Sequence, residues 1–95
     1  MIRHSVVFKL KHKAGSPEEK GFLDEAWKLK SIPGVRKFEV MKQISYKNPY
    51  SFGISMEFED QKDYDFYTNH PDHSRFVEQL WIPNVEVFME IDYLL

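Results

Sequence analysis

The residues best suited to chemistry lie within residues 66–76, which read Phe-Tyr-Thr-Asn-His-Pro-Asp-His-Ser-Arg-Phe. Two histidines, His70 and His73, flank Pro71, and Tyr67 stands three residues before the first of them. Proline fixes its own φ, pushes the preceding residue toward an extended conformation and suits the first turn of a helix. The pattern therefore predicts a helix that begins at Pro71 and carries His73 in its first turn.

This position favours a general base. The positive end of a helix disfavours a charged imidazole, so we expect the pKa of His73 to lie below its usual value of about 6.5. A neutral imidazole accepts a proton near neutral pH, and Tyr67 is the expected partner beside it. The alternative is that His73 only caps its helix while Tyr67 fills the core. His70, extended before Pro71, is expected to have a structural part and to bond the backbone near the turn.

Metal binding is a weaker interpretation of the same segment. His70 and His73 could share a face, but no third ligand stands at a recognisable spacing and the chain has no cysteine. The missing cysteines also exclude a disulfide and a thiol nucleophile. We therefore expect neither a metal site nor a cofactor.

Length and composition indicate one domain, residues 1–95, with a core so modest that a further interface would help to stabilise it. A net charge of -2 gives no electrostatic footprint for nucleic acid. The first residues contain no long apolar run, so we expect no signal peptide, no transmembrane helix and no membrane partner, with the cytoplasm as the default location. Aromatic residues make up 16% of the chain, which predicts a bulky core and a pocket lined by rings.

Residues 2–10 alternate between apolar and polar side chains, which predicts a strand with one apolar face. His4 lies on that face, either as a buried histidine with one hydrogen-bond partner or as part of a site. His12 follows among lysines and is expected to be solvated. Ser16 and Pro17 then mark the start of an amphipathic helix.

Further strands are predicted over 35–44, which reads as an edge, over 50–58 and over 85–93. Helices are predicted from Asp60, as a cap, to Tyr67 and from Pro71 to Trp81. The order βαββαβ predicts an α+β fold of the ferredoxin-like type, with a four-stranded antiparallel sheet and both helices on one face.

The two faces of the sheet are expected to have different tasks. One packs beneath the helices, and the other mixes small, apolar and charged residues, as expected of a face that meets a second sheet. On the second face we expect Lys9 and Glu90 to pair across neighbouring strands. The residues assigned to the helix side of the last strand are Val85, Val87, Met89, Ile91 and Tyr93, whereas Val7 and Phe88 are assigned with Glu90 to the opposite face.

Several segments stand out along essentially the whole length of the chain: the opening Met-Ile-Arg-His-Ser-Val-Val-Phe-Lys-Leu, residues 32–35, the motif at residues 70–73 with Phe76 after it, and the closing Asp92-Tyr93. In the order and spacing of these segments the chain resembles stress-responsive A/B barrel (Dabb) proteins. The resemblance implies a homodimeric α+β barrel, in which two ferredoxin-like sheets meet face to face and the helices lie outside.

One enzyme of this family, olivetolic acid cyclase, closes a linear polyketide by aldol condensation without a cofactor. By this resemblance His73 matches its histidine base, Tyr67 matches its partner tyrosine and His4 matches a histidine in its first strand. The chain departs from that enzyme at Phe52, where the enzyme has a pocket histidine, and at residues 81–84. The ligand implied is a small aromatic or polyketide-like molecule.

Several functions follow from this reading. The first is a homodimer that binds a small, partly aromatic molecule between sheet and helices without turnover. The second is a cofactor-free enzyme of the aldol-type cyclase or lyase kind, in which His73 takes a proton from a carbon beside a carbonyl and Tyr67 holds the enolate oxygen. Related dimeric barrels include cofactor-independent monooxygenases, so oxidation of an aromatic is the third. A pocket closed by Phe22, Trp27 and Phe52 would leave only a structural protein.

Overall fold

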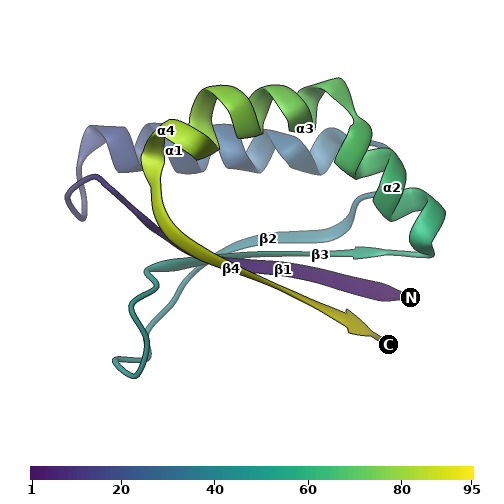
Figure 1. Ribbon diagram of the computed structural model, residues 1–95, viewed down its shortest axis with the longest axis horizontal. Coiled ribbons are helices and arrows are strands. Elements are labelled where there is room, and N and C mark those ends of the chain that lie inside the picture. Colours follow the sequence, from purple (N-terminus) through teal and green to yellow (C-terminus); the bar gives the residue numbers. More distant parts are fainter.

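The computed structural model describes residues 1–95 and has the element order expected from the sequence (Figure 1). Four antiparallel strands form one sheet in the order β2-β3-β1-β4, and the helices lie in a layer on one face of it. This is the predicted ferredoxin-like α+β fold, and none of its helices is long and apolar enough to cross a membrane. The elements are β1 Ile2–Leu10, α1 Pro17–Trp27, η1 Lys28–Ser31, β2 Arg36–Lys42, β3 Phe52–Phe58, α2 Gln61–Asn69, α3 Pro71–Phe76, η2 Val77–Trp81, α4 Ile82–Asn84 and β4 Val85–Leu94.

Side-chain caps begin the helices where the sequence predicts them. Ser16 Oγ accepts a hydrogen bond from the Glu19 N–H at 3.2 Å, and the Glu19 carboxylate accepts one from the Gly15 N–H at 3.1 Å. Asp60 caps α2 in the same way, because its carboxylate accepts from the Asp63 N–H at 3.0 Å. The caps satisfy N–H groups that the first turn of a helix leaves without partners, and so they fix where each helix begins.

The last helical segment is continuous from α3 through η2 to α4, and its middle turn is a π-turn. The N–H of Ile82 donates to the carbonyl of Val77, five residues earlier. Turns of this kind are rare in proteins, and many of those that occur are at functional sites. Here Val77, Trp81 and Ile82 all line one cavity, so the wide turn presents three apolar side chains to the same space.

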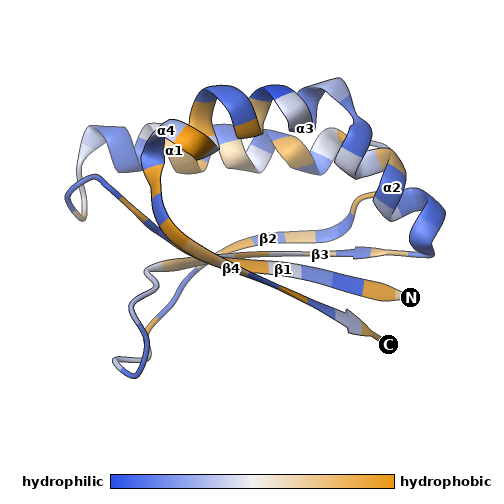
Figure 2. Cartoon of the chain, viewed as in Figure 1, coloured by the Kyte–Doolittle hydropathy of each residue, from blue (hydrophilic) through white to orange (hydrophobic).

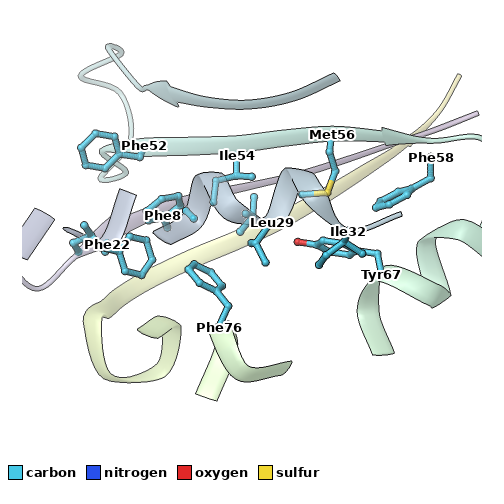
Figure 3. Close-up of a cluster of buried hydrophobic side chains, with 13 residues drawn as sticks. Phe8, Phe22, Leu29, Ile32, Phe52, Ile54, Met56, Phe58, Tyr67 and Phe76 are labelled. Atoms are coloured by element: carbon cyan, nitrogen blue, oxygen red, sulfur yellow. The ribbon is translucent and has the colours of Figure 1, made fainter. Parts of the chain in front are cut away.

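The hydrophobic core lies between the inner face of the sheet and the helix layer (Figure 3). Phe8 and Phe58 have no exposed surface. The Phe8 ring lies against Phe22 of α1 and Trp81 of η2, with ring centroids 5.7 and 5.0 Å apart. Tilted aromatic pairs of this kind stabilise the fold beyond the area that they bury. The prediction of a bulky aromatic core is confirmed.

One irregularity in the pairing of β4 with β1 decides which side chains of β4 face the helices. Lys9 pairs with Val87, but Leu10 pairs with Val85, so Glu86 is an extra residue in β4. Side chains alternate along a strand, and one extra residue therefore exchanges the two faces for the remainder of it. Val85 packs against the core, whereas Val87, two residues later, faces away from it.

The face assigned to most of β4 from the sequence is therefore wrong. Phe88 and Glu90 pair with Phe8 and Val6 on the helix side of the sheet and line a cavity there. Strict alternation counted from Val85 led to the error, because it takes no account of the bulge. Figure 2 shows hydrophobic residues along β4, most of which is exposed. The side chains that share the outer face with Val7 are Val87, Met89, Ile91 and Tyr93.

Two further details differ from the expectations. Lys9 forms its ion pair with Glu86, at 3.3 Å, and not with Glu90. His12 is half buried, and its Nε2 lies 2.6 Å from Asn84 Oδ1, so it is held by the protein and not only by solvent. Both contacts arise because the beginning of β4 lies beside the end of β1.

Candidate functional site

A cavity of about 390 Å³ lies between the sheet and the helix layer. Side chains from β1, β3 and β4 form its sheet side, and side chains from the helical elements, η1 to α4, form the other. Ten of its thirteen lining residues are hydrophobic, and the remaining three are His4, His73 and Glu90. Tyr67 is one of the ten hydrophobic residues and brings a hydroxyl to the wall. The structure thus brings the three site residues expected from the sequence, His4, Tyr67 and His73, to a single cavity.

His73 is held with one ring nitrogen occupied and the other available. Its Nδ1 lies 3.1 Å from the Thr68 carbonyl oxygen, and a carbonyl only accepts, so Nδ1 carries the hydrogen. In the neutral ring Nε2 is then an acceptor. Burial lowers the pKa of His73, and nearby His4 lowers it further, while the Thr68 carbonyl and Glu90 act in the opposite direction. The predicted direction is confirmed, but its main cause is burial and not the helix N-terminus.

Tyr67 reaches from α2 into the core (Figure 3) and is only 3% exposed. Its ring lies against that of His73, with centroids 4.5 Å apart. No protein group bonds its hydroxyl, and no fully buried polar atom lacks a partner, so this hydroxyl has access to the cavity. Burial raises the pKa of Tyr67, and Glu90 raises it further. The phenol therefore keeps its proton and is able to donate a hydrogen bond to a bound molecule.

His4 is oriented by a carboxylate and a phenol at one end of the cavity. Its Nδ1 lies 2.6 Å from Asp92 Oδ1 and 2.8 Å from the Tyr64 hydroxyl oxygen. The Tyr64 hydroxyl donates to Asp92 Oδ2 at 2.8 Å, and burial, followed by this bond, raises the pKa of Tyr64. The carboxylate only accepts, so it selects the His4 tautomer with hydrogen on Nδ1 and leaves Nε2 as the free ring atom. His4 is thus more firmly fixed than the single expected partner implied.

His70, the other histidine of the His-Pro motif, does not line the cavity. Its Nδ1 accepts a hydrogen bond from the Asp72 N–H at 3.1 Å and so caps α3. Its ring also contacts Phe66 edge to face, with centroids 5.7 Å apart. The structural part expected for His70 is confirmed.

Glu90 and Asp92 belong to the site but were not identified from the sequence. Both lie on β4 beyond the bulge, which places them on the same face of the sheet as His4 and Val6. The pattern of alternation gives no sign of this exchange. A signal did exist for Asp92: a histidine on the inner face of β1 needs a partner on a neighbouring strand, and an antiparallel last strand can supply it.

The geometry of the cavity suits proton transfer as well as binding. Tyr67 offers a hydrogen-bond donor, and the free ring nitrogens of His4 and His73 offer acceptors. Apolar walls strengthen such polar contacts, because they exclude water from them. No group of three or more histidine, cysteine, aspartate or glutamate side chains is arranged to hold a metal ion.

The lowered pKa of His73 has a consequence for stability. In the unfolded chain the imidazole of His73 binds a proton at about pH 6.5, whereas in the folded chain it binds the proton only at a lower pH. The unfolded state therefore binds more protons in this window, and the free energy of unfolding should fall as the pH drops below about 6.5. Denaturant titrations across this range should show a shallower fall for His73→Gln than for the unmodified chain. An imidazole resonance of His73 that titrates at or above its usual pKa would contradict this.

Comparisons with known proteins identify the family. The stress responsive A/B barrel domain (Dabb) profile matches residues 2–95. A Dabb family protein with a ferredoxin-like fold from Mesorhizobium loti is 56% identical, and its crystal structure has a TM-score of 0.97 over 99% of this chain and 95% of that one. A search of the curated proteins gave no match.

More distant solved structures share the fold alone. A dimeric ferredoxin-like protein of unknown function from Thermobifida fusca is 18% identical, with a TM-score of 0.80 over 99% of this chain and 90% of its own. Hydroxynitrile lyase from Passiflora edulis is 14% identical, with a TM-score of 0.86 over 99% of this chain and 92% of its own. The profile spans nearly the whole chain and the M. loti protein shares more than half of its residues. The chain therefore belongs to the stress-responsive A/B barrel (Dabb) family.

Proposed function

We propose that this protein is a homodimer that binds a small, partly aromatic molecule in the cavity between sheet and helices. One observation carries the proposal: an apolar cavity contains a hydroxyl and two imidazoles whose cavity-facing atoms have no partner in the protein. Ligand sites have this composition, with mainly hydrophobic walls and a few polar groups that set orientation. Polyketide-like molecules with a carbonyl are one class that fits.

The shape of the wall favours a ring at one end of the ligand. Trp81 and Phe88 meet edge to face, with centroids 5.4 Å apart, and Phe76 lies beside Trp81 at 6.3 Å. Rings of this kind pack well against another aromatic. A carbonyl at the other end would accept the hydrogen of the Tyr67 hydroxyl. The ligand would thus span the cavity from the rings to the polar end.

The outer face of the sheet supports the homodimer. Its polar groups are largely satisfied within the chain: Ser5 Oγ donates to the Ile91 carbonyl at 2.6 Å, and Arg3 pairs with Glu57 at 2.7 Å. The Arg3 guanidinium holds the pKa of Glu57 below its usual value. What remains exposed is mainly apolar, and a second copy of the same face is able to cover it. We call this surface the outer apolar face; its residues are Val7, Met41, Val87, Met89, Ile91 and Tyr93.

A charge on this face should weaken the dimer before it unfolds a protomer. Met89 is 45% exposed in the single chain, so Met89→Asp disturbs little within it, but the new carboxylate would have no partner when covered. We expect the dissociation constant of the dimer to rise by about tenfold or more. Analytical ultracentrifugation over a dilution series measures it, with circular dichroism to confirm the fold.

Phe66→Asp is the matched control, because Phe66 is exposed on α2, away from the outer apolar face. It should leave the dissociation constant unchanged. A folded unmodified chain that sediments as a monomer at micromolar concentration would refute the homodimer.

Binding is tested first by thermal shift against a panel of small aryl ketones and aryl alcohols. Tyr67→Phe should then lower the affinity for a ketone from this panel by about two- to tenfold, the value of one hydrogen bond. Its melting temperature should not fall, because the hydroxyl has no partner in the protein. Tyr46→Phe removes an equivalent hydroxyl from a side chain that is 92% exposed, and affinity should not change. Equal affinity in both variants would argue against the site.

A second function, proton transfer at carbon, is favoured by the state of His73. Its Nδ1–H is held by the Thr68 carbonyl and its pKa is lowered, so Nε2 is a neutral base. In this mechanism Nε2 takes a proton from the carbon beside a ketone carbonyl, and the electron pair moves onto the oxygen. The Tyr67 hydroxyl stabilises that oxygen by hydrogen bonding. Return of a proton to the carbon completes the exchange.

Deuterium uptake from heavy water by the methyl group of acetophenone tests this function by NMR. His73→Gln should lose about a hundredfold or more of any protein-dependent rate, because a general base contributes about 10²–10⁴-fold. The amide keeps a donor for Thr68 but cannot serve as the base. His70→Asn is the control, since asparagine also caps helices and His70 lies outside the cavity. Equal rates in both variants would remove His73 as the base.

A further inference from the structure

We propose that Glu90 makes the cavity selective for aromatic ligands that carry a protonated amine, and against carboxylates. The inference rests on the proposed function and names the class of ligand more narrowly. It begins from a carboxylate that the mechanism above does not use. Glu90 lines the cavity on β4, opposite Val6 of β1, and no hydrogen bond or ion pair within the chain involves it.

Asp92, two residues further along the same face of β4, provides the contrast. One of its oxygens accepts a hydrogen bond from His4 and the other accepts one from the Tyr64 hydroxyl, so both oxygens have partners within the protein. Glu90 has no such partners. The residue directly opposite it on β1 is the apolar Val6, which offers no partner. Glu90 is exposed at the cavity in the single chain, so its carboxylate is free to meet a ligand cation.

The cavity offers Glu90 no cation of its own. None of the thirteen lining residues is lysine or arginine. Lys9 is the lysine of β1. It lies on the opposite face of the sheet and pairs there with Glu86. A ligand carboxylate would therefore meet an unneutralised negative charge, whereas an ammonium would form a charge-assisted hydrogen bond.

The neighbours of Glu90 also suit an organic cation. Phe88 lies on the same face of β4, two residues before it, and Trp81 packs against Phe88. Aromatic faces attract cations, and tryptophan does so most strongly. An aryl amine is able to place its ring among these side chains and its ammonium near Glu90, while the Tyr67 hydroxyl remains free for a carbonyl on the same molecule.

Three probes of nearly equal size separate charge from shape: 2-phenylethylamine, 2-phenylethanol and phenylacetate. Each is titrated into the full chain, with the indole N–H resonances of both tryptophans followed by NMR. Trp81 lines the cavity and reports binding there, whereas Trp27 of α1 lies outside it and serves as the internal control. We expect the amine to bind about tenfold more tightly than phenylacetate, because attraction and repulsion both contribute.

Glu90→Gln keeps the shape and removes the charge. It should reduce the preference for the amine over phenylacetate to about threefold or less, with no loss of melting temperature. Glu86→Gln is the matched control on the same strand, outside the cavity, and should keep the full preference. An unchanged preference in Glu90→Gln overturns the inference, as does equal binding of all three probes to the unmodified chain. If no probe shifts Trp81 while ketones still bind there, the inference fails and the proposed function stands; if nothing binds there, both fail.

Discussion

The position of Glu86 as one extra residue in β4 is the constraint on which the cavity and the outer apolar face both depend. It exchanges the two faces of the strand, so that Phe88 and the acidic residues after it turn toward the helices. Without this bulge the apolar set of β4 would continue into the core, and the carboxylate that orients His4 would lie on the wrong side of the sheet. Bulges are known to redirect side chains beside functional sites, and this one does so for most of the strand.

The cavity persists because the core around it is strong at one end. Phe8, Phe22 and Trp81 pack against one another beneath α1 and η2, and this end of the layer is closed by aromatic rings. At the other end Tyr67 and His73 line the space, and apolar groups packed over the Tyr67 hydroxyl and His73 Nε2 would desolvate these atoms without giving them a partner. The aromatic cluster thus stabilises a fold that keeps polar groups unpaired elsewhere, and a small domain of this kind has little stability to spare.

Patterns that act within one element were enough to predict the architecture. The caps at Ser16 and Asp60, the Pro71 helix start and the alternation of β1 each depend on neighbours in sequence, and each is found in the structure. The direction of the His73 pKa shift was predicted correctly from the helix start, but its main cause is burial by residues distant in the sequence. The faces of β4 were not predictable, because a bulge arises from the match between two strands and leaves no mark in the alternation of either. The contact of His12 with Asn84 was missed because it joins residues that are far apart in the sequence.

β4 contributes residues both to the cavity and to the outer apolar face, and these two contributions depend on each other. This strand is an edge of the sheet, paired only with β1, and most of it is exposed in the single chain. Edge strands are free to fray unless something covers them. A second subunit on the outer apolar face would hold β4 in place from one side, and the Asp92 contacts with His4 and Tyr64 hold it from the other. Dimerisation would then do more than bury apolar surface: it would keep the acidic residues of β4 at the distances that orient the site. This explains why a domain this small can build a polar site on its most exposed strand.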